Sequence, residues 1–336
     1  MTTPVLEIPT AGTTTHRAAD RQDAWTILGA DVSHATSAEE ALKAADLFGW
    51  DVRKIGDVAA TEVTEDGTNR IEMPRTFANV RTNPRTGATE FLATVGNVYT
   101  PIQMESHIEP MDLLKAETGA TFGRGGAYKN GARAFLTMEL PNGLEIGGFD
   151  SHDITIVAFF PHDGSGKASL HVAPMRLRCG NMQTMFIEGA THSWSIPHTA
   201  SASARIAEVH KALTGLFGYQ EAFAAEAERM LHTPLSLARF EEVVDGGVFD
   251  PLDFAPTPRQ QKTWQKRMDT LRTLFLEADT QQGIRGTAWA GYNAVTEYLD
   301  HYATASNVSV RAARSMVSGS NVAKKNRARR LLMLAA

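Results

Sequence analysis

Alternating apolar runs in the first half of the chain, followed by helical periodicity in the second half, constrain the fold more than any other feature. Between residues 50 and 180, apolar residues alternate in short runs that Pro, Gly and Asn separate. Three strand pairs follow from this pattern: FANVR with EFLATV, FGRGGAY with ARAFLTMEL, and ITIVAFF with ASLHVAP. Strands followed by helices predict an α+β fold, in which an antiparallel β-rich region with an inserted helix precedes a mainly α-helical region.

Caps and apolar stripes indicate where the helices lie. Ser37 is a suitable N-cap for a short helix that ends at Gly49, and a second helix over residues 106–117 interrupts the strands. After residue 200, apolar and aromatic side chains recur at helical spacing in two stripes. We expect their largest members to be buried: Trp264, Met268, Trp289, Tyr292 and Leu299.

Length and composition predict a globular chain with more than one part. A chain of 336 residues exceeds what one hydrophobic core usually supports. We expect a disordered N-terminus at 1–20, an α+β antiparallel-sheet domain at 21–185, and a helical region at 186–336 with a basic C-terminal segment. No apolar run is long enough to span a membrane, the N-terminus lacks a secretory pattern, and a single cysteine cannot form an internal disulfide. We therefore expect a cytoplasmic protein with no membrane partner.

The charge is unevenly distributed along the chain. The net charge is −5, yet the segment from His301 to the end contains no acid and seven bases. Five of these bases lie close together: Lys324, Lys325, Arg327, Arg329 and Arg330. Such a segment could attract phosphate although the whole chain is acidic, because screening confines the influence of each charge to about 10 Å. The alternative is a solvated helix whose bases complement its own dipole.

A glycine-rich basic stretch is a second candidate for phosphate contact. Arg124 lies among Gly123, Gly125 and Gly126, and Lys129 and Arg133 follow within ten residues. Backbone without side chains can approach phosphate closely, and nearby cations neutralise it. Alternatively, the glycines serve strand ends that need positive φ. Aromatic residues interleave with bases over 75–135, which is typical either of single-strand stacking surfaces or of strands that line a core.

Acidic, histidine and cysteine residues gather between residues 150 and 179. The cluster comprises Asp150, His152, Asp153, His162, Asp163, His171 and Cys179. These residue types can bind a metal or perform acid–base chemistry, but no pair has zinc-site spacing. Backbone requirements alone explain Asp163 before Gly164 in a turn. We expect no metal and no cofactor, and we expect a structural role for Cys179, although neighbouring arginines could activate its thiol.

One further polar set lies on the late helix. Asn293, Glu297 and His301 recur every four residues and therefore share one helical face. This spacing could ligate a metal, but we expect a solvated polar face.

Three segments resemble one known family. They are FDSHDITIVAFFPHDGSGKASLHVAPMRLRCGNMQTMF at 149–186, VGNVYTPIQ at 95–103 and TAWAGYNAVTEYLDH at 287–301. Together they resemble the family named domain of unknown function 932, also called uncharacterised protein family 0380, which phages and plasmids carry. The resemblance places Arg176, Cys179 and Asn181 at matching positions of the family motif. It implies a mobile-element protein in a bacterial host cell, with a function that is largely unassigned.

Three function classes remain. We expect a nucleic-acid-binding protein, not an enzyme, that assists recombination or replication on single-stranded DNA as a homo-oligomer. The expected contacts are Arg124, Lys129 and Arg133 with the C-terminal bases. One alternative is an enzyme, either a metal-dependent hydrolase that uses the 150–171 cluster or a thiol enzyme that uses Cys179. The other is a non-enzymatic protein that binds a host protein.

Overall fold

The computed structural model describes residues 22–65, 67–177, 180–182, 192–193, 202–316 and 319–334. The N-terminus at 1–20, for which disorder is predicted, lies outside the described residues, and so does Cys179.

An antiparallel sheet forms the centre of the molecule. Its strands run in the order β1-β5-β6-β8-β9-β10, with β7 beside β8 and β11 beside β9. Their bounds are β1 (Ala30–Asp31), β5 (Thr121–Tyr128), β6 (Arg133–Glu139), β7 (Leu144–Ile146), β8 (Asp150–Pro161), β9 (Ser169–Arg176), β10 (Asn181–Met182) and β11 (His192–Ser193). The β5–β6 hairpin turns at Lys129, Asn130 and Gly131, which all adopt positive φ.

Helices cover both faces of this sheet. On β8, Ile154, Ile156, Ala158 and Phe160 belong to the larger hydrophobic core, whereas Val157 and Phe159 belong to a smaller core on the other face. The smaller core also contains Trp25 of α1 and Ala312 of α8. Because successive strand residues face opposite sides and both sides are covered here, β8 is apolar at every position from Ile156 to Phe160.

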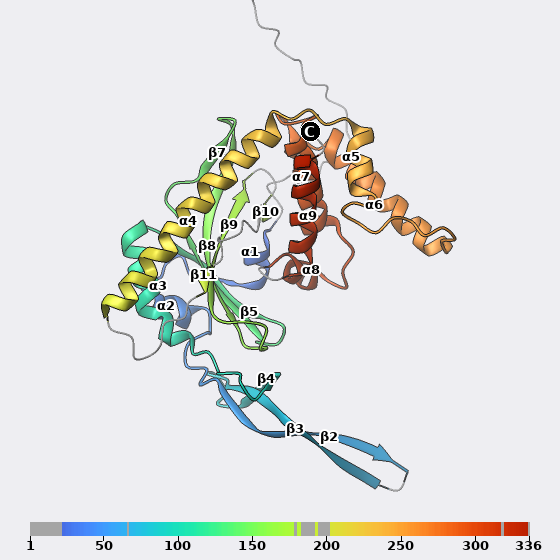
Figure 1. Ribbon diagram of the computed structural model, residues 1–336. Helices are drawn as coiled ribbons and strands as arrows, with labels where there is room; N and C mark the ends of the chain where they lie inside the picture. Colours follow the sequence, from blue (N-terminus) through green and yellow to red (C-terminus); the bar gives the residue numbers. More distant parts are fainter. Residues whose placement is uncertain are drawn as a thin grey trace, which may run out of the picture.

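Nine α-helices are described: α1 (Ala24–Leu28), α2 (Ala38–Ala44), α3 (Ile108–Thr118), α4 (Ala202–Leu231), α5 (Leu237–Val244), α6 (Pro258–Leu276), α7 (Ala288–Glu297), α8 (Val308–Ser315) and α9 (Ser320–Leu334). Two 3₁₀ turns (Met104–His107 and Asp279–Gln281) and a π-helical turn (Tyr298–Tyr302) supplement them. The long helix α4 runs along the sheet (Figure 1). Helices α5, α6, α7 and α9 gather beside one another and share the larger core with α4. No helix among the described residues is long and apolar enough to cross a membrane.

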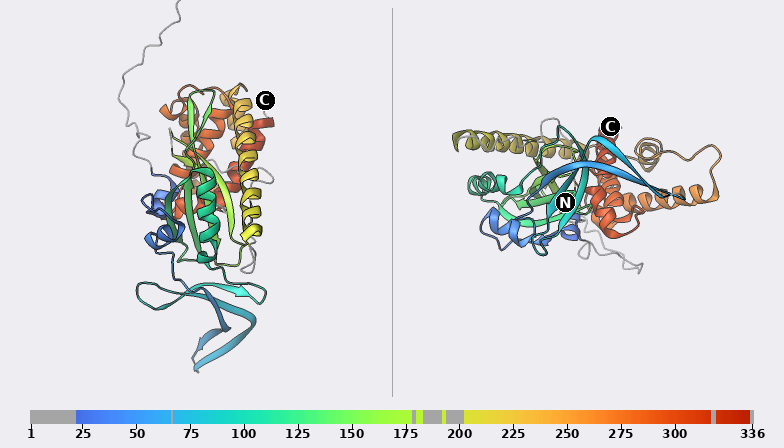
Figure 2. Two further views of the ribbon diagram at one scale, coloured as in Figure 1. Left: turned by 90° about the vertical axis from the view of Figure 1, so that its left-hand side faces the viewer. Right: turned by 90° about the horizontal axis from the view of Figure 1, so that it is seen from below.

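A second, three-stranded antiparallel sheet projects from the body. It comprises β2 (Arg53–Thr64), β3 (Gly67–Thr82) and β4 (Thr89–Gly96). The β2–β3 hairpin extends far beyond β4 and points away from the C-terminal helices (Figures 1 and 2). The hairpin of β3 and β4 is predicted by the sequence, whereas β2 and the outer half of β3 are not.

The α+β prediction is confirmed, with antiparallel strands in the first half and mostly helices in the second. Burial is confirmed for Met268, Trp289, Tyr292 and Leu299. Trp264 is only partly buried, and its indole N–H donates to the Asp245 carboxylate at 2.8 Å. The larger core includes side chains from Val32 to Leu332, so sheet and helices share it.

Candidate functional site

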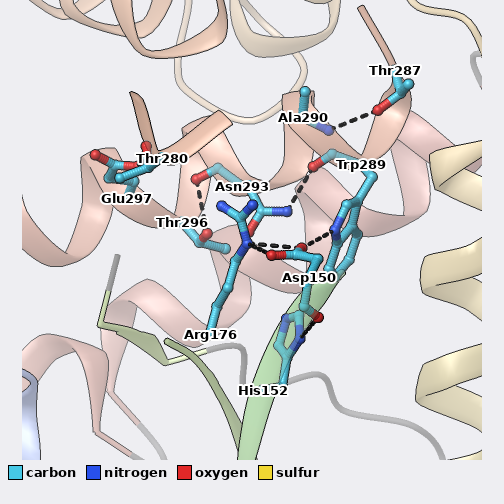
Figure 3. Close-up of polar contacts among 10 residues, drawn as sticks. All are labelled: Asp150, His152, Arg176, Thr280, Thr287, Trp289, Ala290, Asn293, Thr296 and Glu297. Carbon is cyan, nitrogen blue, oxygen red and sulfur yellow. Dashed lines mark hydrogen bonds and ion pairs between the residues drawn. The ribbon is translucent and has the colours of Figure 1, made fainter. Parts of the chain in front are cut away.

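A buried polar junction connects the end of the main sheet to helix α7. Arg176 Nε donates to both carboxylate oxygens of Asp150, at 2.7 and 2.9 Å, and Trp289 Nε1 donates to Oδ2 at 2.8 Å (Figure 3). All three side chains are fully buried. We call Asp150, Arg176 and Trp289 the Asp150 junction. Trp289 lies in the first turn of α7, where the helix dipole favours a nearby anion.

More polar groups surround this junction. The His152 ring lies 5.9 Å from the Trp289 ring, and its Nδ1 is 2.9 Å from the Asp150 backbone oxygen. On α7, Asn293 Nδ2 donates to the Trp289 carbonyl at 2.9 Å, and Glu297 accepts from Thr280 Oγ1 at 2.7 Å (Figure 3). Because these groups are buried and hydrogen-bonded to one another, the arrangement is suited to holding elements together.

The expected solvated face of the late helix is therefore wrong for two of its three residues. Asn293 and Glu297 are fully buried, and only His301 is partly exposed. Glu297 tolerates burial because a hydroxyl donor satisfies its carboxylate.

The structure does not bring the 150–171 cluster together. Ten residues of strand, about 33 Å, separate His152 from His162, and Asp153 points away from His152 toward solvent. His171 belongs to the smaller core's side, where it accompanies Phe159 at 6.2 Å and Ser169 Oγ at 2.8 Å. Among the described residues, no group of three or more His, Cys, Asp or Glu side chains is arranged to hold a metal ion.

His162 occupies a separate buried environment where the projecting sheet meets the body. Its ring lies 5.5 Å from that of Trp50, and neither ring nitrogen has a hydrogen-bond partner among the described residues. Burial, reinforced by the nearby Arg81 cation, lowers the pKa of His162 to about 4. Burial alone lowers the pKa of His171 to about 4 as well. Both imidazoles are therefore neutral at pH 7.

The glycine-rich hairpin offers fewer free cations than its sequence indicates. Arg133 is buried and pairs with Asp163 at 2.8 Å, and Arg124 lies 3.5 Å from Asp31. Lys129 alone of these three bases is exposed. The nearby glycines have a packing role: a Cβ on Gly126 would lie 2.5 Å from the Leu28 carbonyl oxygen.

Most of the aromatic residues in this region line the core. Phe122, Tyr128 and Phe135 are buried, as the core interpretation predicts. The exceptions lie on the projecting sheet, where Phe91 is 58% exposed and Lys54 Nζ stands 4.8 Å from the Phe77 ring centroid.

The basic C-terminal segment divides into buried and exposed bases. Lys325 is fully buried against Asp300 at 2.6 Å, and Arg329 pairs with Glu226. Three others, Lys324, Arg327 and Arg330, are exposed at i, i+3 and i+6 of α9, and we call them the α9 stripe. The Phe249 ring lies beneath one end of this stripe, 6.0 Å from Lys324 Nζ and 4.9 Å from the Arg267 guanidinium carbon of α6.

A small cleft adjoins the position of the family motif. Gly180, Asp300 and His301 line it together with residues of α1 and α8. Arg176 and Asn181 pair in register between β9 and β10, and the Gly180 amide donates to the Arg176 carbonyl at 3.0 Å.

The comparison with protein families identifies the chain. A family model described as Domain of unknown function (DUF932) matches residues 91–330. The chain belongs to this family. No curated protein and no solved structure matches it. The DUF932 match contains every residue of the Asp150 junction, whereas β2 and β3 precede it.

Each of the DUF932-like segments noted in the sequence contributes polar contacts to the architecture. Segments 149–186 and 287–301 meet in the Asp150 junction. In segment 95–103, the Gln103 side chain donates to the Val52 carbonyl at 2.5 Å and accepts from the Val52 amide at 3.1 Å. Tyr99 Oη lies 3.3 Å from Asn79 Nδ2. Sequence reasoning missed Trp289, Gln103 and Asp150 as interacting residues, because their partners are distant in sequence.

Proposed function

We propose that this DUF932 protein binds nucleic acid, with single-stranded DNA as the preferred form, and assists recombination or replication of a phage or plasmid in the cytoplasm of its host cell. The α9 stripe is the observation that carries the proposal. Its three bases are exposed, and no acid follows Asp300 in the sequence to neutralise them. Cations in a row can follow a phosphate backbone whatever its base sequence.

Helix α6 extends the positive potential near the stripe. It carries Arg259, Lys262 and Lys266 in exposed positions at i, i+3 and i+7. Arg267 and Lys324 approach the same Phe249 ring, which brings the two helices' cations together. The net charge of −5 does not oppose this, because a local patch acts within about a Debye length.

The contact assignment follows from exposure. Of the hairpin bases, Lys129 is the one available for phosphate, since Arg133 and Arg124 have carboxylate partners. Of the five neighbouring C-terminal bases, only the three of the α9 stripe are assigned to phosphate, since Lys325 and Arg329 form ion pairs within the fold. The described residues contain no group of side chains arranged to hold a metal ion, so they offer no support for the metal-dependent hydrolase alternative.

The test is fluorescence anisotropy with labelled single-stranded DNA, duplex DNA and RNA of one sequence, across a salt series. Replacing Lys324, Arg327 and Arg330 by Ala should weaken binding and flatten the log Kd–log salt slope by about two units on single strands, at about 0.7 per phosphate contact. A control with Lys43, Lys115 and Lys211 replaced by Ala removes equal charge from α2, α3 and α4 and should keep the wild-type slope.

Two outcomes would contradict the proposal at different levels. Absence of binding to any of the three nucleic acids at low salt and micromolar protein would refute nucleic-acid binding. Binding with an unchanged salt slope in the α9 variant would refute the α9 stripe as the contact site. Lys129→Ala is measured in the same way, and a flatter slope in that variant alone would place the contact on the β5–β6 hairpin.

A further inference from the structure

The β2–β3 hairpin has a distinct outer part. Near the body the register pairs Asp57 with Phe77, but the next pair is Ala59 with Glu72. Four residues of β3 thus lie opposite one of β2, and Arg75 within this bulge has a φ of 61°. Beyond the bulge, residues 59–64 pair with 67–72 as a two-stranded ribbon, which we call the outer ribbon.

The outer ribbon leaves the far edge of β3 open. Strand β4 pairs with this edge of β3 from Thr76 onward. At 67–73, β2 occupies the other edge, and no strand among the described residues pairs with this one. Pro74, which has no amide hydrogen, ends this open edge. Ile71 is 48% exposed and Met73 is 39% exposed beside it. A two-stranded ribbon alone is only marginally stable in water, and an open edge is a template for another strand.

The sequence of this open edge complements itself. In an antiparallel pairing of two β3 edges centred on Ile71, each residue 71+k lies opposite residue 71−k of the other copy. Ile71 then meets Ile71 of the second copy, and Arg70 lies opposite Glu72 on both sides of the axis. Directly opposite apolar and oppositely charged pairs stabilise a sheet. Arg70 and Glu72 are exposed and pair with each other within the chain, at 2.7 Å, so exchange of partners costs little.

The other edge of the ribbon lacks this property. Along β2, residues 57–64 contain two acids and no base. Pairing two β2 edges would therefore bring acids together without a counter-charge. Nucleic acid is also a poor occupant, because residues 57–75 contain five acids and two bases.

We propose that the outer ribbon is a dimerisation surface, in which the β3 edges of two copies pair antiparallel about Ile71 and form a four-stranded sheet. The two-fold symmetry makes the contact isologous and closed. The occupant is a second copy of this chain, since the sequence Arg-Ile-Glu is complementary in charge to the same sequence running antiparallel.

The experiment uses charge reversal and mixing, with association measured by sedimentation velocity over a concentration series. Arg70→Glu alone places acids opposite acids, and Glu72→Arg alone places bases opposite bases. Each single variant should raise the Kd of the homodimer at least tenfold, which corresponds to about 1.4 kcal/mol. The double variant Arg70→Glu/Glu72→Arg restores both pairs and should dimerise like wild type.

Mixing the two single variants separates pairing between copies from folding of the ribbon. Each single variant lacks the intrachain Arg70–Glu72 pair. When the two are mixed, however, the copy with acids at both positions 70 and 72 lies opposite the copy with bases at both positions. The mixture should therefore form heterodimers.

The matched control is Glu62→Arg, which lies on β2 of the same ribbon and should dimerise normally. A wild-type monomer at 100 μM, or single variants that stay monomeric when mixed, would overturn the proposal.

Discussion

Replacing Asp150 by Asn should destabilise the protein more than any surface substitution. The side chain keeps its size, but the Arg176 guanidinium is then buried without its carboxylate. The new amide NH₂ must also face either Arg176 Nε or Trp289 Nε1, which are both donors. Removing one partner of a buried ion pair typically costs about 3–5 kcal/mol, and we expect a loss in this range.

The assay is urea unfolding followed by far-UV circular dichroism, together with a thermal scan. At about 2–4 °C per kcal/mol for a large domain, the melting temperature should fall by roughly 10 °C. Asp153→Asn is the matched control, because Asp153 lies on the same strand and is exposed. Its effect should stay within about 0.5 kcal/mol.

A second variant tests the physical cause. Replacing Asp150 by Leu and Arg176 by Met removes both charges and keeps most of the volume. Because exchange of a whole buried pair for apolar groups is often close to neutral, this double variant should be more stable than Asp150→Asn. We attribute the loss of stability to the Arg176 charge, which is buried without a carboxylate partner in Asp150→Asn. This explanation would be refuted if Asp150→Asn kept its stability, or if the double variant were less stable than Asp150→Asn.

Two further predictions concern packing and pH. Gly126→Ala should destabilise by about 1–3 kcal/mol, because its Cβ would lie 2.5 Å from the Leu28 carbonyl oxygen, whereas Gly218→Ala on α4 meets nothing within 4 Å and should stabilise by up to about 1 kcal/mol in chemical denaturation. Stability should also fall as the pH drops from 6.5 toward 4, because the unfolded chain binds a proton that buried His162, with a pKa of about 4, does not. Between pH 7.5 and 5, the His162→Phe variant should lose about 2 kcal/mol less of its free energy of unfolding than the wild type does. If the variant loses as much as the wild type, His162 is not the source of this pH dependence.

The fold class could be predicted because its signals are local. Alternation in β6, β8 and β9 and the apolar stripes of α6 and α7 depend only on neighbouring residues. The outer ribbon was missed because acidic residues interrupt its apolar alternation. The Asp-Gly pair at 66–67 was the available signal for its turn.

The candidate site was less accessible from sequence. Asp150 and Trp289 are 139 residues apart, and one sequence contains no information that pairs them. Glu297 and Asn293 resemble a solvated face because burial of polar groups depends on partners from other elements, such as Thr280. Arg133 resembles a free cation for the same reason, since its partner Asp163 follows the end of the neighbouring strand β8.

The distance in sequence between the two sides of the Asp150 junction has a consequence for synthesis of the protein. Strands β5 to β9 are complete at Arg176, but Trp289 follows Asp150 by 139 residues, which takes about 7–28 s at 5–20 residues per second. From the synthesis of Arg176 until that of Trp289, the nascent sheet exposes the charged pair and the part of its apolar face that α7 later covers. A ribosome-bound chain that ends before residue 289 should therefore depend on chaperones, and the full-length chain should not.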